Sequence, residues 1–424
     1  MKSGETNKYR WYTVIMLSAV YACSQLDRQI MGILLDPIAK DLGANDTQMG
    51  FLVGLTFAVF YTFLAIPIAM IADRTNRKNV IAISVVAWSG MTAVCGLVSN
   101  FAQMALARIG VAVGEAGSSP SSVSIISDLF DEKSRATALS VFVVGANVGV
   151  LIAFLGGGIL LDNYGWRTTF IVVGLPGVLL GLLVYLTVPE PKKALVDGKP
   201  KSGASFKETF WHMVKVPALR HVLIGKALGA FVGYGFILWI PTFLVRSHGL
   251  TGTQIGFTLA MFAGLGGAVG TLMSGRVVDY LGKRDERWRA WAISVSKLVP
   301  IPFLVSFLLL DQFLVAVIFY IVPSILGSFY LAPSTALVQN LVTEPMRTVA
   351  SAISMFLLNI IGMGFGPQGV GILSDFLAPA YGEDSLRYAL AAFTVVNIWG
   401  AYHFWRAGVL IGRDGAAMQA VRSA

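Results

Sequence analysis

Twelve long apolar stretches, separated by short turns or charged loops, fill most of the chain. A helix that crosses the hydrocarbon core of a bilayer needs roughly 20 such residues. Backbone polar groups find no water in that core, and a helix satisfies them within its own segment. The pattern therefore predicts an all-α membrane protein with twelve transmembrane helices, at approximately residues 11–35, 47–71, 79–99, 101–128, 135–162, 167–188, 218–246, 253–279, 288–310, 312–341, 348–377 and 387–412.

The positions of the basic residues predict the orientation of these helices. Only 13% of the 424 residues are charged, whereas a soluble domain has about 25%. Of the 32 lysines and arginines, 24 lie in the N-terminal segment, the C-terminal segment or the loops after even-numbered helices, and such residues concentrate on the cytoplasmic side. We therefore expect both termini in the cytoplasm and the chain in the plasma (inner) membrane. The net charge of +9 then reflects topology, and we expect no nucleic-acid partner.

The chain repeats itself at a nearly constant distance. The run Thr47-Gln48-Met49-Gly50-Phe51 returns as Thr253-Gln254-Ile255-Gly256-Phe257, and Asp73 returns as Asp279. Such a repeat indicates duplication of a structural unit. The prediction is two pseudo-symmetric six-helix halves, at residues 1–188 and 218–424 (with a short cytoplasmic tail), joined by a cytoplasmic linker at 189–217. Within the linker, residues 206–216 are expected to form an amphipathic helix on the inner membrane face.

Four charged residues interrupt apolar stretches, and they are the first candidates for function. Asp27 and Arg28 lie in the first stretch, and Arg108 and Glu115 lie in the fourth. A charge at the bilayer centre costs from about 3 to over 10 kcal/mol on different scales, so it faces a partner or a wet cavity. Two half-bundles with a site near the midplane are the architecture of alternating-access transporters. The sequence thus favours a secondary transporter.

Helical geometry suggests how these four residues interact. Arg108 and Glu115 are seven residues apart, which is about two turns and roughly 10 Å of rise on one helix face. That spacing is too long for a tight pair, so we expect Asp27 to be the partner of Arg108. Burial raises the pKa of a carboxyl group and a nearby arginine lowers it. The prediction is that Asp27 and Glu115 exchange protons under the control of Arg108; a static ion network between the helices is the alternative.

One loop motif resembles a large transporter family. The run Asp73-Arg74-Thr75-Asn76-Arg77-Lys78 is similar to the loop signature of the major facilitator superfamily, in which glycines stand where this chain has Ala69 and Asn76. The second copy keeps both glycines, as Gly275 and Gly282. The resemblance covers the whole chain and implies the twelve-helix fold and alternating access.

Residues in the first half resemble the spinster branch of that superfamily. The matching runs are Leu26-Asp27-Arg28-Gln29, Gly110-Val111-Ala112-Val113-Gly114-Glu115-Ala116 and Ile126-Ser127-Asp128-Leu129-Phe130. The known members move lysolipids and sphingoid lipids such as sphingosine-1-phosphate, and some are thought to be proton-coupled. The resemblance therefore implies a proton-coupled transporter of an amphipathic lipid.

The resemblance also implies roles for particular residues. A cytoplasmic gate that locks one state would include Asp73, Arg74, Arg77, Asp128, Arg135 and Asp279. Substrate contacts would come from Arg28, Arg108, Tyr234, Trp239, Phe329 and Tyr330. The alternative for the two gate aspartates is a helix cap and topology signal, and the alternative for the aromatic residues is packing. We expect Lys226, near a helix end, to reach water with its amine, and Lys297 to lie on a peripheral helix.

The sequence lacks the motifs of several other functions. It contains no phosphate-binding loop for ATP, no histidine spacing for a metal and no serine-nucleophile motif. We expect no cofactor, no metal and no enzymatic activity, with protons and a lipid-like molecule as ligands and a monomer as the working unit. The first alternative is a proton-coupled transporter of a small organic anion or drug, and the second is a lipid sensor that does not transport.

Overall fold

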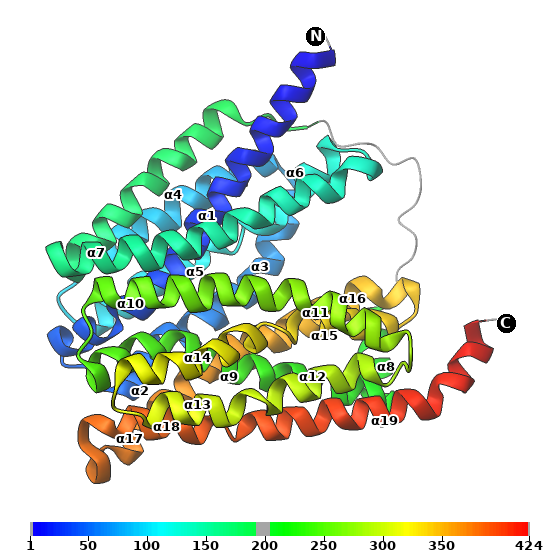
Figure 1. Ribbon diagram of the computed structural model, residues 1–424. Helices are drawn as coiled ribbons and strands as arrows, with labels where there is room; N and C mark the ends of the chain where they lie inside the picture. Colours follow the sequence, from blue (N-terminus) through cyan, green and yellow to red (C-terminus); the bar gives the residue numbers. More distant parts are fainter. Residues whose placement is uncertain (1–2, 192–203, 423–424) are drawn as a thin grey trace. The chain divides into compact units, whose positions relative to one another are not determined.

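The computed structural model describes residues 3–191 and 204–422, and these residues form helices and no strand (Figure 1). They divide into two compact units. The first unit combines α1–α7 with Ile240–Val245 and Gly249–Ala260, and the second contains the other described residues. Both units are built from helices that are long and apolar, as expected for a chain whose backbone has to be satisfied inside a membrane.

The first unit begins with a single long helix and ends with another. Its helices are α1 (Ser3–Leu42), α2 (Asp46–Val53), α3 (Leu55–Arg74), α4 (Arg77–Cys95), α5 (Phe101–Glu115), α6 (Ser118–Leu129), α7 (Glu132–Thr187) and α10 (Gly252–Leu259). The start of α10 belongs here because the Asp162 carboxylate of α7 accepts hydrogen bonds from the backbone N–H groups of Gly252 and Thr253. A carboxylate at this position satisfies N–H groups that have no partner within the helix.

The second unit follows a short amphipathic helix. Its helices are α8 (Phe206–Lys215), α9 (Pro217–His248, apart from Ile240–Val245), α11 (Gly267–Gly282), α12 (Trp288–Leu298), α13 (Pro300–Leu309), α14 (Phe313–Gly327), α15 (Leu331–Asn340), α16 (Arg347–Leu357), α17 (Gly366–Tyr381), α18 (Ser385–Phe393) and α19 (Val396–Arg422). Helix α8 is the helix expected within the linker, and it exposes Phe206, Phe210 and Trp211. Part of that linker, residues 192–203, lies outside the described residues. The limits of the two sequence halves stay a prediction.

The helix lengths confirm a twelve-helix membrane protein. Eight helical stretches of the described residues are long and apolar enough to cross a membrane. Two of them, Ser134–Thr187 and Glu344–Gly412, have 54 and 69 residues, and each has room for two crossings because a residue adds about 1.5 Å and the hydrocarbon core is about 30 Å thick. The remaining two crossings are α1 and the α5–α6 pair, which carry the four charged residues of the apolar stretches.

A glycine divides α7 into the fifth and sixth crossings. Gly165 has a φ of 73° and a ψ of 170°, so the helix is broken there. Residues with a side chain rarely adopt a positive φ, whereas glycine does so without steric cost. The break lies between the two stretches predicted at 135–162 and 167–188, and Figure 1 shows the two arms of α7 on either side of it. The predicted fourth helix is also interrupted, because α5 ends at Glu115 and α6 begins at Ser118.

Close backbone approach holds α7 against α1. A Cβ atom added to Gly149 would lie 2.1 Å from the carbonyl oxygen of Ala22, which is backbone and cannot move independently. Small residues allow this kind of approach, and in lipid it stabilises helix pairs through van der Waals contact. The packing matters for function because α1 also carries Asp27 and Arg28.

We predict that Gly149→Ala destabilises the protein although alanine is the better helix former. The added methyl group forces α1 and α7 apart, and overpacking of this kind costs about 1–3 kcal/mol. Thermal unfolding of the purified protein in a neutral detergent measures the effect. Gly90→Ala is the matched control, because nothing lies within 4 Å of its Cβ position; that variant should be as stable as the parent or more so. Equal melting temperatures for both variants would contradict the packing argument.

Candidate functional site

An ion pair joins α1 to α5 in the first unit. The Arg28 Nε atom donates to the Glu115 Oε1 atom at 2.6 Å, and the Glu115 side chain is 1% exposed. The Ser24 hydroxyl donates to the same oxygen. Ser24 and Arg28 reach one acceptor because residues four apart lie on the same face of a helix. The pair thus fixes one carboxylate oxygen of Glu115, while the Oε2 atom has no hydrogen-bond partner among the described residues.

Aromatic rings surround the Arg28 side chain. Its guanidinium carbon lies 4.4 Å from the centre of the Tyr61 ring and 5.1 Å from that of Phe57, and the two rings stack on each other. A guanidinium over an aromatic face is favourable, and more so when it is shielded from water. The Arg28 side chain remains 21% exposed. It is therefore held in place while part of it stays accessible to a ligand.

Asp27 is buried beside this pair without a hydrogen bond. Its exposed fraction is 1%, and neither carboxylate oxygen meets a donor in hydrogen-bond geometry among the described residues. Thr92 and Trp88 approach the carboxyl group, and Glu115 and Arg108 are the charged groups that act on it. A buried ionised carboxylate without donors is costly. Asp27 is therefore a group for which the neutral, protonated form is favourable.

Arg108 does not form the expected ion pair with Asp27. Its side chain is buried, its guanidinium carbon lies 5.3 Å from the centre of the Phe57 ring, and its Nε and Nη1 atoms have no hydrogen-bond partner in the part of the chain that the structure describes. The pair forms between Arg28 and Glu115 instead. The spacing of residues along a helix does not give the direction of their side chains. Consecutive residues of a helix point about 100° apart, so Arg28 reaches Glu115 from a position that Asp27 does not share.

The residues predicted as a gate are brought together in part. Arg77, at the start of α4, is 3% exposed and pairs with Asp128 at 2.5 Å and with Glu190 at 2.9 Å. It also donates to the Ser124 hydroxyl at 2.8 Å. Arg77 thus joins the ends of α4, α6 and α7, because Glu190 follows α7 directly. Several donors in one rigid fork make arginine suited to this role.

The surroundings of three other predicted gate residues are also defined by the structure. Arg74 and Asp279 are exposed, and the Arg135 Nη2 atom donates to the Phe130 carbonyl at 3.4 Å. The side chain of Asp73 lies outside the described part of the chain. The roles of these residues stay predictions.

The predicted substrate-binding aromatic residues belong to the second unit, and three of them are buried. The Trp239 indole is fully buried and donates to the Pro367 carbonyl at 2.9 Å. Phe329 and Tyr330 are 5% and 8% exposed and lie in apolar clusters. Tyr234 is half-buried. The expectation that Lys226 reaches water is wrong, because only 3% of it is exposed.

Four contact residues were missed in the sequence, each for an identifiable reason. Ser24, Phe57 and Tyr61 are ordinary residues for a membrane helix, and nothing in their spacing distinguishes them. Glu190 stands between two prolines directly after the sixth apolar stretch. An acidic residue directly after an apolar stretch was the available signal. Among the described residues, no group of three His, Cys, Asp or Glu side chains is placed to hold a metal ion.

Comparison with known proteins identifies the family. A model of the Major Facilitator Superfamily matches residues 17–367. The chain belongs to the major facilitator superfamily. Its relatives include an MFS-type efflux pump of Mycolicibacterium smegmatis, which is 32% identical over 95% of this chain and 94% of the relative. The protein is therefore a membrane transporter and not an enzyme.

Other superfamily members support the spinster resemblance and one further relationship. A solved bacterial homologue of the human lysosomal transporter spinster is 29% identical, covers 96% of this chain and 98% of its own, and has a TM-score of 0.88. The sphingosine-1-phosphate transporter SPNS2 of Danio rerio is 26% identical over 95% of this chain and 85% of its own. A probable galactarate/D-glucarate transporter of Bacillus subtilis is 26% identical over 70% of each chain.

We predict that Arg77→Met destabilises the protein by roughly 1.5–3 kcal/mol, because two carboxylates lose the donor they share. The measurement is the melting temperature of the purified variant in detergent. Arg74→Met is the matched control, since Arg74 belongs to the same loop region and is exposed. An equal decrease in melting temperature for both substitutions would contradict the claim that the buried ion pairs of Arg77 stabilise the protein.

Proposed function

We propose that this superfamily member is a proton-coupled secondary transporter that moves an amphipathic lipid by alternating access. The observation that supports it most is the group of buried charges in the first unit: an Arg28–Glu115 pair with the unpaired Asp27 carboxyl beside it. Groups of this kind inside transmembrane helices are costly and mark ion or proton pathways. The candidate cargo is a sphingosine-1-phosphate-like lipid or a lysophospholipid.

Proton exchange in this proposal is divided between two carboxyl groups. Asp27 and Glu115 act on each other as like charges in a buried setting, where ionisation of both is unfavourable. The proposal assigns the exchanged proton to these two acids. Arg108, which lies near both without an ion pair, favours the ionised state of whichever carboxyl group it faces. A change in its position would move the proton, as proposed from the sequence.

Coupling to the cargo follows because the Glu115 carboxylate and an anionic headgroup compete for the Arg28 guanidinium. Protonation of Glu115 removes the negative charge that holds the Arg28 guanidinium, so the guanidinium becomes available to an anionic headgroup. A headgroup bound to Arg28 favours the protonated carboxyl group in turn, because the effect of one ligand on another is reciprocal. The stacked Phe57 and Tyr61 rings keep Arg28 in position during the exchange. The aromatic residues Tyr234, Trp239, Phe329 and Tyr330 are proposed to contact the lipid, together with Arg28 and Arg108.

The gate in this proposal is the Arg77 cluster. Its ion pairs with Asp128 and Glu190 are formed in the present structure, and a change of state would exchange them for other contacts. Asp73, Arg74, Arg135 and Asp279 are proposed to take part in that exchange. We further propose that the protein works as a monomer in the plasma (inner) membrane with both termini in the cytoplasm.

We predict that Glu115→Gln and Asp27→Asn abolish pH-driven transport and leave the protein folded. The amides keep the shape of the side chains but cannot bind or release a proton. Purified protein is reconstituted into liposomes that contain a pH indicator, and the internal pH is followed after lysophosphatidylglycerol is added. The parent protein should couple the lipid to a pH change. Glu208→Gln, on the exposed face of α8, is the control and should behave as the parent does.

Full pH coupling in both Glu115→Gln and Asp27→Asn would overturn the proton assignment. The same liposomes discriminate between the cargo classes. Coupling to galactarate but not to the lysolipid would support a transporter of small organic anions, which the relationship to the galactarate/D-glucarate transporter favours. Binding of the lysolipid without any flux would indicate a sensor.

A further inference from the structure

Two lysines are buried in the second unit without an acidic partner. Lys226 of α9 is 3% exposed and Lys297 of α12 is 6% exposed. No charged side chain among the described residues acts on either amine, and burial is the one influence found on both groups. Among the described residues, every buried aspartate and glutamate belongs to the first unit. Among its described residues, the second unit therefore buries two amines in an apolar setting, where the ionised form is costly unless an anion lies nearby.

Neutral groups hold the Lys226 amine. Its Nζ atom donates to the Thr335 hydroxyl of α15 and to the Ser354 hydroxyl of α16, both at 2.9 Å. An ammonium group has three donors, so one of them is left for a further acceptor. Hydroxyl oxygens carry no charge and do not balance the ammonium. The buried side chain thus has a position fixed by two contacts and an unmet need for an anion.

The Lys297 amine lies on an aromatic ring. Its Nζ atom is 3.6 Å from the centre of the Tyr330 ring, and 3.1 Å from the position that a Cβ atom of Gly229 would take. Tyr330 belongs to an apolar cluster that includes Val222 and Ile293. The ring attracts the cation but supplies no negative charge. A buried ion without a counter-ion is costly, so the arrangement favours binding of an anion from outside the chain.

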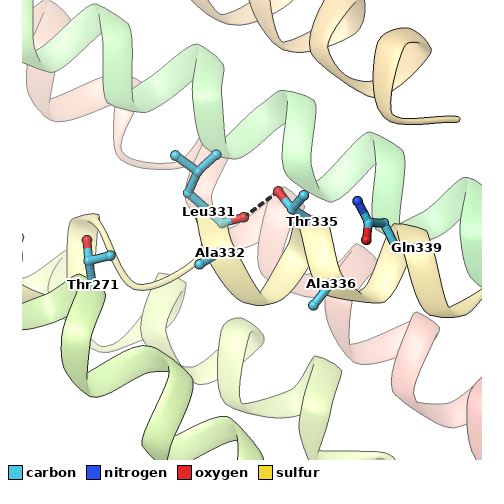
Figure 2. A pocket seen from close by; sticks show the side chains of 6 residues that line it. All are labelled: Thr271, Leu331, Ala332, Thr335, Ala336 and Gln339. Carbon is cyan, nitrogen blue, oxygen red and sulfur yellow. Dashed lines mark hydrogen bonds between the residues drawn. The ribbon is translucent and has the colours of Figure 1, made fainter. Parts of the chain in front are cut away.

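A cavity of about 430 Å³ adjoins this charged region, and it lies wholly within the second unit. Figure 2 shows its lining: one residue of α11 and a row along α15, namely Thr271, Leu331, Ala332, Thr335, Ala336 and Gln339. Thr335 both lines the cavity and accepts the hydrogen bond from Lys226. Leu331 also lines the cavity. It follows Tyr330 in the sequence, and the Lys297 amine lies over the Tyr330 ring. The cavity therefore combines an apolar wall with polar groups, the Lys226 amine in contact with one lining residue, and the Lys297 amine on a ring next in sequence to another.

We propose that this cavity binds the anionic group of an amphipathic molecule, a phosphate ester or a carboxylate. Lys226, whose amine contacts Thr335, and Lys297, beside Tyr330, would supply the positive charge, and the Gln339 amide would supply a hydrogen bond; the Thr271 hydroxyl already donates to the Gly267 carbonyl. The alkyl part would lie along Leu331, Ala332 and Ala336. The role of this cavity as a cargo site rests on the proposed function. Binding of an anion to it can be measured separately, in an experiment without transport.

The test uses the full chain in a neutral detergent and short probes that share one tail. Octyl phosphate, octanoate, octyltrimethylammonium and octanol are compared by the shift in melting temperature at equal concentration. The two anions should stabilise the protein, and the cation and the alcohol should not. Inorganic phosphate, which has no alkyl tail, is tested separately to distinguish binding of a free anion from binding of an amphiphile. If it produces the same shift as octyl phosphate, the site binds the free ion and the lysine assignment still holds.

Lys226→Met and Lys297→Met are the decisive variants. An apolar side chain of similar length removes the desolvation cost of a buried charge that has no counter-ion, so this replacement should not destabilise the fold. Each variant should therefore melt no lower than the parent without ligand and should lose most of the shift with octyl phosphate. Lys283→Met, at an exposed lysine of the same unit, should keep the shift. Because two lysines are tested separately, the experiment remains informative if one of the variants does not fold.

An unchanged octyl phosphate shift in both methionine variants would overturn the site. A lower melting temperature without ligand in both would show that the chain already satisfies the two charges, and would also overturn it. The test is separable from the proton proposal, because Asp27→Asn should keep the anion shift whatever its effect on transport. Loss of pH coupling in Asp27→Asn with no anion shift in the parent would leave the transport proposal standing and the site refuted.

Discussion

The ion pair between Arg28 and Glu115 is the interaction on which the functional account depends. It joins α1 to α5 inside an apolar bundle, and it holds one carboxylate oxygen with two donors. Its position requires the close packing of α1 against α7, since that packing determines where α1 lies. The adjacent Asp27 has no such donor. One satisfied acid and one unsatisfied acid, side by side, make an arrangement in which a single proton changes the electrostatic balance.

The two units treat charge in different ways. In the first, Asp27, Glu115 and Arg108 are buried and Arg28 is 21% exposed, and the formal charges of the four balance when all are ionised. In the second, the buried lysines have only hydroxyl groups and an aromatic ring. A set with both signs of charge suits exchange of a proton, because the two arginines offset the charge of whichever acid is ionised. Two buried lysines without a counter-ion suit recognition of an anion, because a bound anion offsets the free-energy cost of burying their positive charge. Transport of an anionic amphiphile would use both properties.

Much of the fold was predictable from the sequence because it follows from solvation. Long apolar stretches specify membrane helices, and the break at Gly165 falls where the predicted fifth and sixth helices separate. The sequence also singled out Asp27, Arg28, Arg108 and Glu115 as candidates, since charges in apolar stretches are rare. Their partners were not predictable, because the choice between Arg28 and Arg108 depends on side-chain direction and on the Phe57 and Tyr61 rings. The burial of Lys226 was missed for the same reason: a lysine near a helix end reaches water unless neighbouring helices cover it, and tertiary packing decides that.

The most direct test of the central claim is to count the protons that accompany cargo binding. Isothermal titration of the detergent-purified protein with lysophosphatidylglycerol, in buffers of different ionisation heat, gives that number. This lipid has a phosphodiester that does not titrate near neutral pH, so any proton exchanged belongs to the protein. The account predicts an observed heat that depends on the buffer in the parent protein and a dependence that is lost in Glu115→Gln. Binding with the same heat in every buffer would contradict it.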